Sequence, residues 1–90
     1  METVQASILE DGKVIANDVT VELEVTRRGW QGQFTLPSDK VLKLQRDYEM
    51  KTADGREGLF VLSSVPSNIQ GMRLFIFKGN GYFGLPGNTP

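Results

Sequence analysis

A tight-turn signal, Asp54-Gly55, separates two strand-like runs between residues 48 and 64. Gly has no Cβ and Asp tolerates the left-handed backbone region, so this dipeptide supplies the positive φ angles that a hairpin turn needs. The run after the turn, residues 59–62, is apolar on both faces, which is typical of a strand that is central in its sheet or covered on both sides. The sequence therefore predicts a β-hairpin around which a small all-β domain is organised.

Two registers of this hairpin are compatible with the sequence. A two-residue loop would place Tyr48 opposite Val61. A type I turn closed by a glycine bulge would place Tyr48 opposite Phe60 and Lys51 opposite Glu57. The second register is preferred, because it puts an aromatic pair on one face and an opposite-charge pair on the other.

Alternating or apolar runs predict further strands over residues 3–9, 14–16, 19–26, 33–36 and 72–78. Turns are expected at Asp11-Gly12 and at Asn17-Asp18. Residues 38–48 fit either a single helical turn or an irregular or extended connection that packs Leu42 and Leu44. Six or seven strands with a turn every eight to twelve residues predict a small antiparallel barrel or sandwich in one domain, residues 1–81. The Gly- and Pro-rich residues 82–90 are expected to form a partly flexible tail.

The composition limits the chemistry of the chain. Its 90 residues are enough for one hydrophobic core, and they include no Cys and no His. Thiolate zinc sites, cysteine nucleophiles and Ser-His-Asp arrangements are therefore excluded. Glu22 and Glu24 share one face of a strand, but no third ligand is near, so they are interpreted as solvent-facing acids rather than a metal pair. We expect a non-enzymatic protein with no cofactor and no metal.

The distribution of charged and apolar residues also bears on the surface charge and the location of the protein. Residues 1–26 carry six acids against one Lys, and residues 27–90 carry nine basic residues against five acids. This asymmetry would give an acidic and a basic face if the halves stay apart, but interleaving of the halves in one barrel is the commoner outcome. The sequence shows no leader pattern and no apolar run of membrane-spanning length, so a cytoplasmic location without membrane association is expected.

Two stretches combine basic and aromatic residues. In the first, two arginines precede the only Trp, and glycines nearby allow the backbone to turn closely. In the second, alternation puts one Arg and two Phe on the same face of strand 72–78. Cations that meet phosphate beside aromatic rings that stack on bases are typical of single-stranded nucleic-acid binders. The candidate binding surface consists of Arg27, Arg28, Trp30, Arg73, Phe75 and Phe77.

Structural alternatives exist for the same residues. Burial is the commoner fate of a large apolar side chain, so Trp30 is interpreted first as a core residue that caps one end of the barrel. Phe75 and Phe77 share their face with Arg73, which should be the wetter face unless another element covers it. Asp54 and Gly55 are assigned to the turn. Arg56 could bind an anion, but pairing with Glu57 or a neighbouring strand is the simpler interpretation, so no catalytic site is predicted there.

The spacing of several aromatic and glycine residues resembles small bacterial β-barrel domains of uncharacterised function. The resemblance covers about residues 30–81 and implies a compact barrel with an Asp-Gly-Arg hairpin, but no substrate. It rests on Trp30-x-Gly32-x-Phe34-x-Leu36-Pro37, Tyr48-x-Met50, Asp54-Gly55-Arg56-x-Gly58-x-Phe60 and a Phe-rich strand ending at Gly79. Barrels that bind cyclic dinucleotides use a spaced Arg-x-x-x-Arg arm, which the adjacent Arg27 and Arg28 do not match.

Two functions remain open. The first is a non-catalytic interaction module that binds a protein partner or itself through the strand edges of an incompletely closed sheet, with an apolar contact from Phe75 or Phe77. The second is weak binding of single-stranded nucleic acid or a nucleotide through the Arg and aromatic surface. The two predict different salt dependence, because phosphate contacts release counterions and an apolar interface does not.

Overall fold

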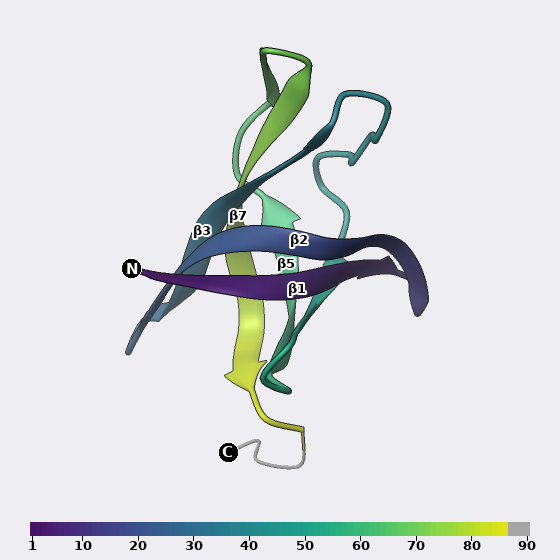
Figure 1. Cartoon of the computed structure of the whole chain (residues 1–90). Coiled ribbons are helices and arrows are strands. Elements are labelled where there is room, and N and C mark those ends of the chain that lie inside the picture. Colours follow the sequence, from purple (N-terminus) through teal and green to yellow (C-terminus); the bar gives the residue numbers. More distant parts are fainter. Residues whose placement is uncertain (87–90) are drawn as a thin grey trace.

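The computed structural model describes residues 1–86, which form seven strands joined by turns and one longer connection (Figure 1). No helix occurs in this part of the chain. The strands are β1 (Glu2–Glu10), β2 (Lys13–Thr26), β3 (Gly29–Pro37), β4 (Tyr48–Thr52), β5 (Glu57–Leu62), β6 (Ser67–Ile69) and β7 (Met72–Gly84).

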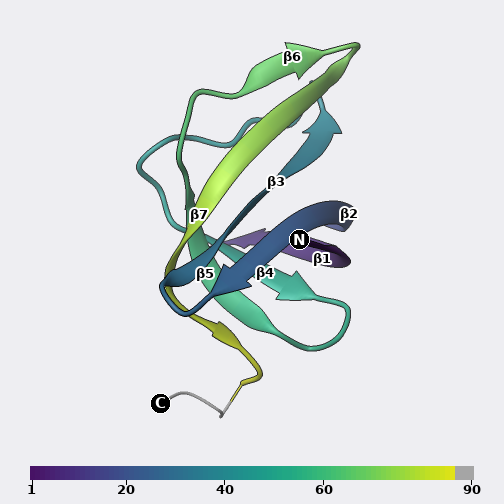
Figure 2. The same ribbon diagram turned by 90° about the vertical axis from the view of Figure 1, so that its left-hand side faces the viewer.

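Six of the strands close into an antiparallel barrel. The sheet order is β3-β2-β1-β4-β5-β7-β6, and an additional pairing of β3 with β7 closes the circle. Strand β6 pairs only with the first part of β7 and stands outside the closed barrel. Figure 2 shows the hairpin of β6 and β7 at one end of the molecule, beyond strands β1 and β2. The predicted class, a small antiparallel barrel of six to seven strands, is confirmed.

The first hairpin turns where the sequence indicates. Glu10 pairs with Lys13, and the two loop residues Asp11 and Gly12 have φ angles of 51° and 78°. The turn predicted at residues 17–18 is wrong, because strand β2 runs through these positions without interruption. There Asp18, with φ 55°, forms part of a bulge that shifts the register between β1 and β2. Such bulges bend a strand and increase its twist, which helps a long strand follow the wall of a barrel.

The central hairpin adopts the preferred register. Tyr48 pairs with Phe60, and Lys51 pairs with Glu57. The amide of Gly55, whose φ is 96°, donates to the carbonyl of Thr52 over 3.0 Å, as expected for a turn closed by a glycine bulge. Local turn chemistry thus determines which side chains of β4 and β5 face the core.

Residues 38–47 form an irregular connection, with turns at residues 38–39 and 44–45, rather than a helical turn. They cross one end of the barrel, where Leu42 is buried in the main core. The backbone amide of Lys43 donates to the Tyr48 hydroxyl over 2.8 Å, and the Arg46 guanidinium pairs with the Glu10 carboxylate. These contacts tie the connection to β4 and β1.

Aromatic rings dominate the core. Phe75 and Phe77 have exposed fractions of 0% and 1%, so the expectation that their face is the wetter one is wrong. Phe34 stacks on Phe75 with ring centroids 5.3 Å apart, and Phe60 lies 5.0 Å from Phe77. The face of β7 that points into the barrel therefore carries Phe75 and Phe77, and the opposite face, with Ile76, points outward.

Strand β5 is central, between β4 and β7, but its outer face is not covered. Phe60 and Leu62 point into the core, whereas Leu59 is about half exposed. The predicted boundary at residue 81 falls inside β7, which continues to Gly84. Of the predicted tail, residues 87–90 lie outside the described residues.

Candidate interaction surfaces

Trp30 plugs one end of the barrel instead of offering a stacking face. Its exposed fraction is 4%, and its ring stacks on Phe83 with centroids 4.3 Å apart. The indole N–H donates to the carbonyl of Gly81 over 3.2 Å. Gly58 and Gly79 leave room for the ring, because a Cβ atom at either position would lie within 3 Å of it. The interpretation of Trp30 as a capping core residue is confirmed.

The six residues of the candidate binding surface do not come together. Arg27 and Arg28 form the turn between β2 and β3, whereas Arg73 lies beside Leu36 near the other end of β3. Leu36 lies seven positions after Gly29 along the strand, a distance of roughly 23 Å at the usual rise per residue. With Trp30, Phe75 and Phe77 buried and the arginines at opposite ends, the predicted surface is corrected to two separate regions.

The first region is a hollow beside the β2–β3 turn, with a volume of about 440 Å³. The register places three side chains in a row across its wall, since Gln31 pairs with Glu24 on one side and with Lys78 on the other. Gln31 donates from Nε2 to Glu24 Oε1 over 2.9 Å. The remaining lining residues are Thr26, Arg28, Gly29, Trp30 and Gly79.

The cations of this region have no carboxylate partner within residues 1–86. The ion pairs there use Arg46 and Arg56, and none involves Arg27, Arg28 or Lys78. A second hollow of about 340 Å³ lies on the other side of the turn and also contains Arg27 and Arg28. The turn therefore presents positive charge next to two recesses.

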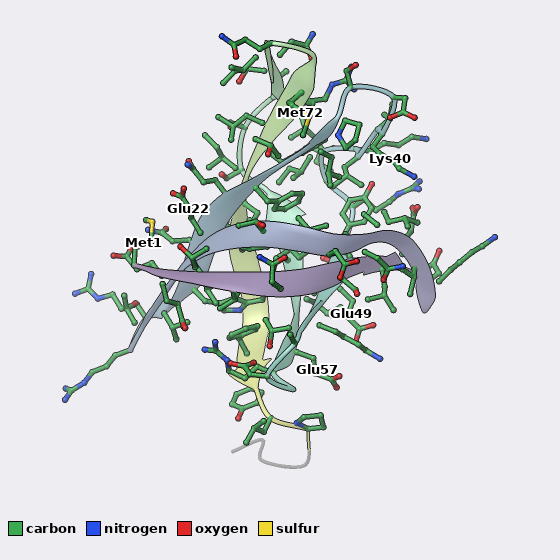
Figure 3. All side chains as sticks on the ribbon, in the orientation of Figure 1. Met1, Glu22, Lys40, Glu49, Glu57 and Met72 are labelled. Atoms are coloured by element: carbon green, nitrogen blue, oxygen red, sulfur yellow. The ribbon has the colours of Figure 1, made fainter. Side chains whose placement is uncertain are left out.

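The second region is the arm, defined as strand β6 with residues 72–76 of β7. Cross-strand partners share a face, so Pro37, Met72 and Ile69 form one row on its outer side. Ile69, Met72 and Ile76 have exposed fractions of 50%, 37% and 41%. The outer residues of the arm, together with Pro37 of the neighbouring strand β3, form what we call the arm face: Pro37, Ile69, Met72, Leu74 and Ile76. Figure 3 shows Met72 at the end of the molecule where the arm lies.

The arm face also carries no charged residue, and the arm has an open edge. Between Glu57 and Arg73 the sequence carries no charged residue, the longest such stretch in the chain. Among residues 1–86, strand β6 pairs with β7 on one side only, so the sheet leaves the backbone groups of its other side unpaired. Natural edge strands are commonly protected by charges, by bulges or by being very short; β6 has no charge and no bulge, and its edge is three residues long. Sequence alternation alone assigned Met72, Leu74 and Ile76 to the drier face, and for that reason it missed this surface.

A polar cluster joins the central turn to strand β1. Arg56 makes two hydrogen bonds to the Glu2 carboxylate, 2.9 and 3.1 Å long, and also binds Asp54. The Arg56 guanidinium and the Thr52 hydroxyl, both bonded to Asp54, lower the pKa of that carboxyl from 3.8 to about 2. Arg56 likewise lowers the pKa of Glu2, and these carboxylates raise the pKa of Arg56. Each charge is used in holding the turn.

The glutamates of strand β2 are engaged in hydrogen bonds rather than grouped as metal ligands. Glu22 and Glu24 accept hydrogen bonds from Gln33 and Gln31, respectively, on the outer wall of the barrel. Within residues 1–86 no three acidic side chains are grouped so that they could hold a metal ion. The same residues contain no helix with the length and apolar character of a membrane span.

Comparisons with known proteins add no family to this description. The chain matches no protein-family model, and no curated protein or solved structure is significantly similar to it. The resemblance to small bacterial β-barrel domains stays a prediction.

Proposed function

We propose that this protein is a non-catalytic interaction module that binds a protein partner, or a second copy of itself, through the arm. The observation that supports this most is the combination of an exposed apolar face with an open, uncharged strand edge. Apolar groups gathered on a surface favour association, because burying them removes apolar area from water at roughly 25 cal/mol per Å². A strand edge adds backbone hydrogen bonds to an incoming strand.

The rest of the molecule suits a binding scaffold. The polar cluster at Arg56 is occupied with Glu2 and Asp54, and the Trp30 ring fills one end of the barrel. Because residues 72–76 of β7 also pair with β3 in the barrel wall, the barrel holds the β6–β7 hairpin in a fixed orientation, which lowers the ordering cost of binding. A cytoplasmic location is part of the proposal.

Site-specific photo-crosslinking tests the arm as the contact surface. A photoreactive phenylalanine analogue would replace Met72, and the protein would be irradiated in the cells that express it. The matched control carries the same analogue at Thr3, an exposed residue of β1 that lies opposite Glu22 on the barrel wall. A discrete crosslinked polypeptide from position 72 alone is expected. Equal crosslinking from both positions, or none from either, would overturn the proposal.

A further inference from the structure

We infer that the hollow beside the β2–β3 turn binds a small phosphorylated ligand, with the phosphate held by Arg28 and Lys78. This site is separate from the arm and does not depend on the function proposed for it. Its walls come from three adjacent strands, since Glu24, Gln31 and Lys78 are neighbours across β2, β3 and β7.

The hollow is large enough for a small ligand. Gly29, which pairs with Thr26 at the end of the strand pair, lines the hollow and contributes no side chain to it. The volume of about 440 Å³ is within the range that small-molecule sites occupy, roughly 300 to 1,000 Å³.

The charges indicate an anion. Arg28 and Lys78 line the hollow from the turn and from β7, and neither makes an ion pair within residues 1–86. Arg27, on the same turn, adds a third cation beside the site. Guanidinium and ammonium groups together suit phosphate, since one donates two parallel hydrogen bonds and the other acts as a point charge.

Glu24 limits the kind of anion. Its Oε1 atom already accepts a hydrogen bond from Gln31, and its negative charge faces the same hollow. A bare, highly charged anion would be repelled by Glu24. A phosphate ester that also carries hydroxyl or amino donors satisfies both sides, with its phosphate toward Lys78 and its donors toward Glu24. Trp30 lies under the hollow and is too buried to stack on a base.

A titration observed by heteronuclear NMR tests this inference with AMP as the probe. Amide shifts are expected at residues 26–31 and 78 and at the Trp30 indole, and they should weaken with added salt. Adenosine, which lacks the phosphate, should cause less than a tenth of these shifts. The Arg28→Ala/Lys78→Ala variant should lose them, whereas Lys51→Ala, which removes an exposed cation on β4, should keep them.

The outcomes are distinguishable. Both altered side chains of the double variant are exposed, so a dispersed spectrum should show that the fold is intact. AMP shifts that persist in the double variant, or are scattered over the barrel, would overturn the inference. So would shifts caused by a single-stranded oligonucleotide but not by AMP, because they would point to a polymer-binding surface. None of these results bears on crosslinking from the arm.

Discussion

Gly79 and Trp30 are in such close contact that a Cβ atom on Gly79 would lie 1.9 Å from the indole nitrogen. The glycine belongs to β7 and the Trp to β3, so the absence of one side chain allows the other to close the barrel.

The first prediction concerns this contact. Gly79→Ala should lower the free energy of unfolding by about 1 to 3 kcal/mol, because an overpacked core must shift its rings. In a Trp30→Phe background the smaller ring leaves room, so the same change should cost less. Urea denaturation of the four proteins measures this coupling. Additive losses would show that the contact is not the source of the cost.

The second prediction concerns pH. The pKa of Asp54 is about 2 in the folded protein and about 3.8 ordinarily, so the folded state favours the charged form. The stabilisation is nearly complete above about pH 4 and is lost as the pH falls through the folded pKa of about 2. Asp54 is half exposed, so solvent reduces the effect. Asp54→Asn should lower Tm by a few degrees at pH 6 and by much less near pH 2. A pH-independent difference in thermal melts would contradict this assignment.

The third prediction concerns the longer connection. Tyr48→Phe removes the acceptor for the Lys43 amide while keeping the buried ring. Loss of this partly buried hydrogen bond should cost about 1 kcal/mol. Hydrogen exchange should show faster exchange at Lys43, with amides of the β2–β3 pair unchanged. Unchanged exchange at Lys43 would mean that the hydroxyl does not hold the connection.

The fourth prediction concerns the arm face. Ile76→Lys alters an outward side chain, so the free energy of unfolding should change by less than about 0.5 kcal/mol. Binding of a hydrophobic dye such as ANS to the folded protein should fall, because the variant interrupts the apolar face. Phe75→Lys, one position away and fully buried, should prevent folding. If the two substitutions were equally damaging, the assignment of faces on β7 would be wrong.

Local chemistry explains what could be predicted from the sequence. The register that pairs Tyr48 with Phe60 follows from one turn and its glycine, all within a few residues. The turn at Asp11-Gly12 is predictable for the same reason. At Asn17-Asp18 the same signal misleads, because a left-handed Asp suits a bulge as well as a turn. Only pairing with β1 on both sides of these positions, between Lys13 and Leu23, decides between them.

The faces of β7 show why the candidate site was not predictable. Residues 74–77 are apolar or aromatic on both faces, and the single charge at Arg73 favours the wrong face as the outer one, so alternation separates the faces without saying which is inside. The inner face is decided by partners far along the chain, such as Phe34 beside Phe75. The same long-range pairing puts Arg73 far from Arg28, which a reading of neighbouring residues could not reveal. The hollow beside the β2–β3 turn likewise forms only when β2, β3 and β7 are in register.

The pairing of β3 with β7, which closes the barrel and which we call the seam, also affects how the chain folds. It pairs Gln31 with Lys78 and Pro37 with Met72, so the chain must close a long loop before the backbone hydrogen bonds between these two strands can form. The β1–β2 and β4–β5 hairpins need only short loops and can form early. High contact order of this kind gives folding times on the order of milliseconds to seconds. Closing the barrel is thus expected to be the slow step, with Trp30 reaching its final position only when that seam forms.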